Sequence, residues 1–204
     1  MSDKVQLNFN GLWPTMLAKR ILPNYEQPTL SLAQYILEQE ALEKDFTARY
    51  QEQDLFADQH SSVQWLKNQI NETTQALITQ SGVKQLPIWT LFSWYNVNRY
   101  GDHHAPHTHP QCYLSGTYYV QLPTLPSDPL DPKANSSCIS FYDPRIGANM
   151  ITAGGDPDSK SSHKVFPTPG TLLMWPAPLQ HAVHPNLCDE LRISISFNVI
   201  VNKN

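Results

Sequence analysis

Residues 88–97 read IWTLFSWYNV and residues 191–201 read LRISISFNVIV, and these two stretches decide the fold. Both are rich in the aromatic and β-branched residues that favour strands, and in the second, polar and apolar residues alternate with a period of two. Further stretches of the same kind occur at 117–122 (TYYVQL), 138–142 (CISFY) and 171–175 (TLLMW). Five strands without helices between them predict an antiparallel sandwich or barrel.

The chain before Pro87 follows a different pattern. Residues 1–27 show no helical period and predict an extended segment or a first strand. A helix is predicted from Thr29 to about Tyr50, with Ser31 as its N-cap. A second helix is predicted from Ser61, which forms a capping-box pattern with Gln64, to a C-terminal cap at Gly82. Their apolar stripes are Leu32, Tyr35, Ile36, Leu42 and Phe46 in the first helix, and Val63, Leu66, Ile70 and Leu77 in the second.

These patterns predict one structural domain with two parts. Residues 1–86 form an extended segment and two helices, whose apolar stripes and polar backs suit packing on a sheet. Residues 87–204 form an all-β core that carries the chemistry. Turn-rich sequence separates its strands, notably at 123–136 and 144–162, and the stretch 146–162 with Gly154 and Gly155 could form a mobile lid.

Composition narrows the class of protein. The 204 residues are 40% hydrophobic and 16% charged, which indicates a globular chain. A net charge of −4 gives no electrostatic reason to bind nucleic acid or acidic membranes. The polar start is unlike a signal peptide, no apolar run approaches about 18 residues, and the three cysteines show no CxxC spacing. We therefore expect a cytoplasmic protein with neither a nucleic-acid nor a membrane partner.

Histidine is the informative residue type. His107 and His109 are two residues apart, so both side chains point to the same side of an extended chain. With a third imidazole from elsewhere they could bind a first-row metal, although a polar loop with hydrogen-bonded histidines would show the same pair. His181 is the expected third partner; His184 competes with it, but residues three apart rarely both face inward. The neighbouring His103 and His104 are expected to lie in a loop.

Two pairs of polar residues could line a pocket. Arg192 and Ser194 lie on the face of their strand opposite the apolar Ile193, Ile195, Phe197 and Val199. That polar face either meets solvent or lines a pocket in which the guanidinium holds a carboxylate. Asn96 and Asn98 also share a face, and they either enter the pocket or make turn hydrogen bonds before Gly101. The aromatic residues Trp89, Trp94, Tyr95, Tyr118, Tyr119 and Trp175 are expected to be mainly core, with a few at the substrate entrance.

In their order and spacing these residues resemble the 2-oxoglutarate- and Fe(II)-dependent oxygenase superfamily. His107-Thr108-His109 takes the place of the HxD/E motif, His181 that of the distal histidine, and Arg192-Ile193-Ser194 that of the RxS motif. Upstream, Asn96-Val-Asn98-Arg-Tyr-Gly101 resembles the N-x-Y-x-x-G pattern of the nucleic-acid alkylation-repair branch, with Asn98 replacing the tyrosine.

A closer resemblance is to a group of small 2-oxoglutarate–Fe(II) oxygenases in which HxHPxxxLSGxYY is typical. It spans roughly residues 88–200. The matching stretches are His107-Thr-His109-Pro110, Leu114-Ser-Gly-Thr-Tyr-Tyr119, Phe141-Tyr-Asp-Pro-Arg145 and Arg192-Ile-Ser-Ile-Ser-Phe-Asn198.

The resemblance implies a mainly β fold, with a double-stranded β-helix (jelly-roll, cupin-like) core covered by the N-terminal α-helices. It implies Fe(II) held by His107, His109 and His181. It also implies that Arg192 and Ser194 bind the co-substrate 2-oxoglutarate, with Asn96 and Asn98 beside it. Dioxygen would be consumed and succinate and CO2 released, most commonly with hydroxylation of a small molecule or a peptidyl side chain.

One departure from the family pattern leaves alternatives open. His109 stands where a carboxylate normally completes the metal site. Either His109 is a ligand, or Asp143 reaches the metal, or the position is open, and we favour His109. A cupin-type dioxygenase that uses three histidines without 2-oxoglutarate, and a non-catalytic metal-binding jelly roll, are the alternative functions.

Overall fold

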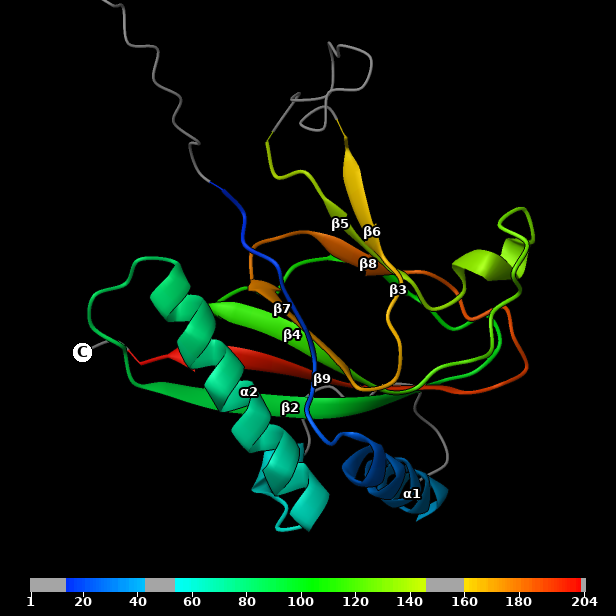
Figure 1. Ribbon diagram of the computed structural model, residues 1–204, viewed down its shortest axis with the longest axis horizontal. Helices are drawn as coiled ribbons and strands as arrows, with labels where there is room; N and C mark the ends of the chain where they lie inside the picture. Colours follow the sequence, from blue (N-terminus) through cyan, green and yellow to red (C-terminus); the bar gives the residue numbers. More distant parts are fainter. Residues whose placement is uncertain (1–13, 43–53, 146–159, 203–204) are drawn as a thin grey trace, which may run out of the picture.

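The structure is a computed structural model that describes residues 14–42, 54–145 and 160–202. Within this part of the chain, strands form two antiparallel sheets that face each other (Figure 1). The larger sheet has the order β1 (Ala18–Ile21), β7 (Thr171–Pro176), β4 (Leu114–Gln121), β9 (Arg192–Val201) and β2 (Trp89–Asn98). The smaller sheet has the order β3 (His104–His107), β8 (His181–Val183), β5 (Ile139–Tyr142) and β6 (Ser162–Val165). The predicted mainly β, jelly-roll fold class is confirmed.

Two long helices, α1 (Glu26–Leu42) and α2 (Ser61–Gln80), cover the larger sheet on the side away from the smaller one (Figure 1). Two short 3-10 helices, η1 (Leu55–Ala57) and η2 (Pro132–Asn135), lie in the connections. The apolar residues of the predicted helix stripes that the structure describes and the apolar face of β9 form a single buried cluster, while the side chains of Leu42 and Phe46 lie outside the described part. It includes Leu32, Ile36, Val63, Leu66, Ile70, Ile193, Ile195, Phe197 and Val199. None of the described helices is long and apolar enough to cross a lipid bilayer.

The predicted start of the first helix was wrong. The helix begins at Glu26 instead of Thr29, and Ser31 lies inside it. The Tyr25 carbonyl accepts the first helical hydrogen bond from the Thr29 N–H at 2.8 Å. Pro28 does not prevent this, because N–H groups in the first turn have no partner within the helix. The predicted end near Tyr50 lies outside the described residues.

The ends of α2 differ in how they match the sequence pattern. The helix begins at Ser61 as predicted, but the capping box does not form. The Gln64 side chain instead donates to the carbonyls of Asp58 and, at 3.4 Å, Phe56, which ties the helix to η1. Gly82 has a φ of 83°, and its N–H donates to the Thr79 carbonyl at 3.0 Å, so the C-terminal cap is confirmed.

The five predicted strands are present, with β4 beginning at Leu114 instead of 117. The short strands β3, β6 and β8 were not predicted, because three or four residues cannot display a period. Residues 1–27 were predicted to form either an extended segment or a first strand, and Ala18–Ile21 of this stretch form the strand β1. The predicted lid falls largely on 146–159, outside the described residues, and β6 begins at Ser162.

Strand register aligns the residues on the inner face of the larger sheet into rows. Moving along the sheet, these rows are Trp175–Ser115–Asn198–Phe92, then Leu173–Thr117–Ser196–Trp94, then Tyr119–Ser194–Asn96, then Arg192–Asn98. A smaller apolar cluster joins Leu173 and Trp175 to Phe141 and Ile139 of the smaller sheet. The centre of the inner face is therefore polar, while the outer face under the helices is apolar.

Gly116 of β4 marks a close contact in the larger sheet. A Cβ at this position would lie 2.2 Å from Phe197 Cζ and 2.5 Å from the Leu173 carbonyl oxygen, which belongs to the backbone and cannot rotate away. We expect Gly116→Ala to lower the free energy of unfolding by about 1–3 kcal/mol, the usual cost of overpacking. Urea denaturation measures this change. Thr90→Ala, at an exposed position of β2, is the control, and equal midpoints for the two variants would contradict the prediction.

Candidate metal centre

Three histidines converge at one end of the smaller sheet. His107 ends β3, His181 begins β8, and the two are paired in register. His109 follows β3, and its backbone N–H donates to the Ala177 carbonyl at 3.0 Å, which fixes the segment against the turn after β7. One nitrogen from each ring can be chosen so that all three lie within 4.8 Å of one another. In the described part of the chain this is the single group of three or more potential ligands that meets this spacing.

Local hydrogen bonds orient two of the three rings. His107 Nδ1 lies 2.7 Å from the Ala105 carbonyl and His181 Nδ1 lies 3.0 Å from the Leu179 carbonyl. A carbonyl only accepts, so each Nδ1 carries the proton and each Nε2 keeps a free lone pair. His109 is held by ring packing instead, stacked on His181 with centroids 5.2 Å apart and close to Trp94 at 6.0 Å.

The site favours neutral imidazoles. Burial lowers the pKa of His181 to about 3, although its bond to the Leu179 carbonyl acts in the opposite direction and the nearby histidines lower it further. Burial, followed by the charge of His107, lowers the pKa of His109 to about 4. Near pH 7 these two rings are therefore uncharged, which is the form that binds metals.

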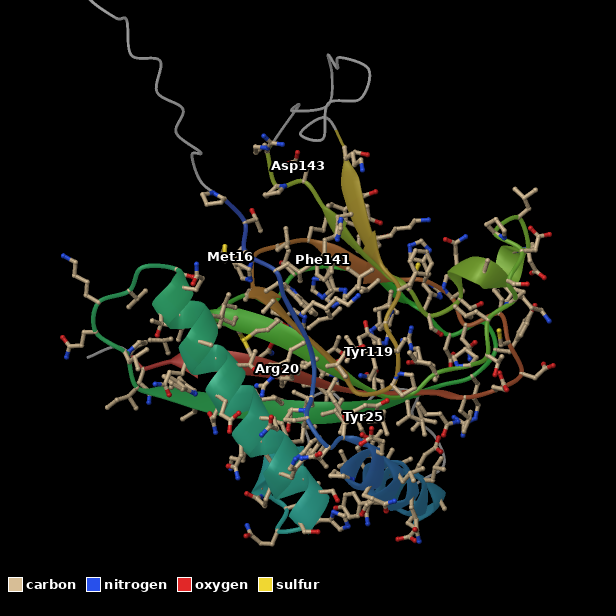
Figure 2. All side chains as sticks on the ribbon, in the orientation of Figure 1. Met16, Arg20, Tyr25, Tyr119, Phe141 and Asp143 are labelled. Atoms are coloured by element: carbon tan, nitrogen blue, oxygen red, sulfur yellow. The ribbon has the colours of Figure 1, made fainter. Side chains whose placement is uncertain are left out.

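Neither Asp143 nor His184 joins the group. Asp143 lies beyond Phe141 towards the outer end of the smaller sheet (Figure 2), and its carboxylate accepts from Arg145 Nη2 at 2.7 Å and Nε at 3.0 Å. His184 Nε2 is bonded to Ser140 Oγ at 2.8 Å. His109 is thus the residue that the structure places beside His107 and His181.

The three rings lie on the wall of a cavity between the sheets that is partly open to solvent. None of the described residues that line it is acidic. Besides the triad, the lining residues are Trp94, His104, Ser115, Gly116, Thr117, Tyr119, Ile139, Trp175, Val183, Arg192, Ser194 and Ser196.

Arg192 is the buried cation of this cavity, with 1% of its surface exposed. Its Nη2 donates to Asn98 Oδ1 at 2.7 Å, whereas Nε and Nη1 have no hydrogen-bond partner among the described residues. Burial lowers its pKa to about 10, so the guanidinium stays charged at pH 7. A buried charge is costly unless it is paired. The two nitrogens without a partner therefore fit an anionic ligand in the cavity.

The two predicted asparagines are both buried behind the lining. Asn98 holds Arg192, and its own carbonyl accepts from Asn186 Nδ2 at 3.2 Å. Asn96 Nδ2 donates to Ser196 Oγ at 3.0 Å and contacts Ser194 Oγ at 3.5 Å. The turn around Gly101 is closed by other groups, since the Asp102 N–H donates to the Arg99 carbonyl at 3.1 Å.

Two lining residues were not singled out in the sequence. His104 was expected in a loop, where it could help at the mouth of the site; it lies in β3 and lines the cavity. Burial, then the charge of Arg192, lowers its pKa to about 4. Tyr119 was one of the aromatic residues expected to be mainly core, with a few at the substrate entrance; it is buried and lines the same cavity. The sequence carries no periodic pattern that could have revealed His104, because β3 is only four residues long.

Comparisons with known proteins agree with this geometry. A sequence-family profile described as "Putative 2OG-Fe(II) oxygenase" matches residues 92–198. No curated protein sequence matches the chain.

Several solved structures share the fold. A prolyl-4-hydroxylase from Pseudomonas putida is 13% identical with a TM-score of 0.64, covering 92% of this chain and 93% of its own. HygX from Streptomyces hygroscopicus, with nickel and 2-oxoglutarate bound, is 12% identical with a TM-score of 0.62, covering 92% and 83%. SnoK, an α-ketoglutarate-dependent carbocyclase from nogalamycin biosynthesis, is 13% identical with a TM-score of 0.60, covering 91% and 79%.

The buried histidines predict a pH dependence of stability in the metal-free protein. In the unfolded chain a histidine binds a proton with a pKa near 6.5, whereas folded His109 and His181 remain neutral to about pH 4 and 3. Between these values the unfolded state binds more protons, so stability rises with pH and is lost as the pH falls below about 6.5. We expect the Tm of chelator-treated protein to fall from pH 7.5 to 5.

A matched pair of variants separates this effect from general acid denaturation. His109→Gln removes one of the two buried histidines and should make the fall in Tm with falling pH shallower. His163→Gln, at an exposed position, should show the same fall in Tm as the wild type. Parallel curves for His109→Gln and wild type would contradict the prediction.

Proposed function

The chain belongs to the 2OG-Fe(II) oxygenase family, and from this premise we propose that it hydroxylates a small molecule or a peptidyl side chain. As a member of this family it is an oxidoreductase that uses Fe(II), 2-oxoglutarate and dioxygen. The observation that carries the proposal is the guanidinium of Arg192, which has two nitrogens without a partner among the described residues and lies in the same cavity as the three histidines.

In this proposal His107, His109 and His181 hold the metal. Their donor set fits Fe(II), because imidazole nitrogen is a good ligand for iron and two of the Nε2 lone pairs are already free. When bound, the metal supplies the redox chemistry that activates dioxygen. All three protein ligands are uncharged, so negative charge at the site must come from what binds there. A dianionic 2-oxo acid meets that requirement.

Arg192 then anchors the distal carboxylate of 2-oxoglutarate through N–H groups of the guanidinium that Asn98 does not occupy. Asn98 orients the guanidinium, and Asn186 in turn holds the Asn98 backbone. Ser194 lies one position along the same face and offers a hydroxyl, with Asn96 behind it. Preorganised donors of this kind bind an anion without rearranging.

Aromatic rings exclude water from the metal side of the cavity. The Trp175 ring packs edge-on to His181 with centroids 4.7 Å apart, and Phe141 packs on Trp175 at 4.9 Å. Trp94 contributes from β2 next to His109. Solved structures with the same fold include a prolyl-4-hydroxylase and an enzyme of nogalamycin biosynthesis, so the fold suits both substrate classes.

The three-histidine site alone would also suit a dioxygenase that needs no 2-oxoglutarate, or a non-catalytic metal-binding protein. Either would leave Arg192 as a buried cation whose hydrogen-bond partner among the described residues is a neutral amide. Burying a charge without a partner of opposite charge costs free energy, and in these two alternatives no ligand would offset that cost. The arginine therefore favours the enzyme that uses 2-oxoglutarate.

Metal binding tests the triad. We expect His181→Ala to weaken Fe(II) binding by more than the roughly 10–100-fold that loss of a residue supporting a ligand costs. His184→Ala is the matched control, since His184 is three residues away and bonded to Ser140, and it should bind Fe(II) like the wild type. Anaerobic calorimetric titration gives both affinities, and equal losses in the two variants would refute the assignment of His181.

Co-substrate binding tests the proposal as a whole. Anaerobic titration of the Fe(II)-loaded protein with 2-oxoglutarate should produce a visible absorption band. Arg192→Met should weaken the binding by at least about 30-fold, because it removes a buried charged partner. Arg99→Met, which removes an exposed arginine paired with Glu40, should have no such effect. Wild-type protein that holds iron but shows no response to 2-oxoglutarate would sink the proposed function.

A further inference from the structure

His104 lines the same cavity as the metal triad and lies in β3, three residues before the triad ligand His107. His107 is paired with His181, whereas His104 is paired with Val183 and the register shifts between them. The four residues His104–His107 of β3 thus lie opposite the three residues His181–Val183 of β8. One extra residue on one strand is the signature of a β-bulge. Residues three apart would normally face opposite sides of a strand, and the bulge brings both imidazoles into the cavity.

The imidazole of His104 lies close to the triad and within the electrostatic influence of Arg192. Its ring centroid is 6.2 Å from that of His107, and it is not part of the metal-binding group. Arg192 is the strongest charge acting on it. His103, His107 and His181 each have a ring nitrogen bonded to a backbone carbonyl, whereas the ring of His104 makes no hydrogen bond with the described residues. Its ring N–H is therefore free to donate to a ligand.

We propose that His104 donates a hydrogen bond to the carboxylate of 2-oxoglutarate that Arg192 holds, and so helps to select a co-substrate with a distal carboxylate. The inference rests on the proposed function. A carboxylate offers about four acceptor positions, and one edge of a guanidinium fills at most two of them. An imidazole supplies a further donor without placing a second permanent charge beside the guanidinium, as a lysine would.

The opposite wall fits this arrangement. Tyr119 of β4 is buried, lines the same cavity, and interacts with the charge of Arg192. On the smaller sheet, the other residues level with His104 are Val183 and Ile139, which have no polar side-chain atoms. Among these three paired residues of the smaller sheet, His104 is therefore the one whose side chain can donate a hydrogen bond into the cavity.

The test compares two variants and two ligands on protein loaded with Ni²⁺, which avoids turnover. His104→Phe keeps a ring but removes the donor, and His104→Gln keeps an N–H donor. 2-Oxobutyrate has the metal-binding 2-oxo acid end of 2-oxoglutarate but no distal carboxylate. Calorimetric titration gives the affinity of each variant for Ni²⁺ and for each 2-oxo acid. His103→Gln is the control, because His103 is exposed and adjacent in sequence.

We expect His104→Phe to bind 2-oxoglutarate about tenfold more weakly, the loss of one hydrogen bond to a charged group, and His104→Gln to lose less. Affinities for Ni²⁺ and 2-oxobutyrate should stay within about twofold of wild type. The inference is overturned if His104→Phe binds 2-oxoglutarate normally, or if it loses Ni²⁺ or 2-oxobutyrate equally. Wild-type protein that binds no 2-oxoglutarate refutes the proposed function itself, and the inference with it.

Discussion

The burial of Arg192 inside the sandwich is the constraint on which the rest of the structure depends. A guanidinium on the inner face of β9 needs polar neighbours, and these are the asparagines and hydroxyls of β2, β9 and β4. The inner face of the larger sheet therefore cannot supply most of the hydrophobic core. That role passes to the outer face, where Ile193, Ile195 and Phe197 pack under α1 and α2. The helices are thus required by the polar interior, because without them this apolar face would meet water.

The alternation of polar and apolar residues in β9 made the two-faced strand and its helical cover predictable from the sequence. A strand reading Arg-Ile-Ser-Ile-Ser-Phe-Asn has one apolar and one polar face, and the apolar helix stripes upstream offered the matching surface. Which of the two faces turned inward could not be read from β9 alone. That depends on the partner strands: Ser115, Thr117 and Asn96 line up beside Ser194 and Ser196 only once the register is known. The contacts of Gln64 were missed for a similar reason, since they depend on where η1 lies relative to α2.

The metal triad depends on local hydrogen bonds, which orient the rings, and on long-range strand pairing, which brings the rings together. The His107 and His181 rings are each oriented by a carbonyl two residues earlier in their own chain, so their tautomers are set by backbone conformation alone. What brings them together is the pairing of β3 with β8, two strands of only four and three residues. Such short strands have little stability of their own. The His109 N–H bond to Ala177 and the Tyr113 bonds to Val199 and Ala177 fasten the segment after β3 to the larger sheet. The site is therefore held by the sandwich rather than by its own strand pair.

The histidines three residues apart show where sequence reasoning holds and where it fails. For His181 and His184, the rule that such residues face opposite sides is correct: one lines the cavity and the other bonds Ser140 behind it. For His104 and His107 the same rule fails, because the bulge in β3 inserts one residue and restores both rings to the same side. A bulge is a property of two strands, since it exists only as a mismatch with a partner. The sequence of residues 104–109 could therefore place His107 and His109 together but could not place His104 with them, although all three line the same cavity.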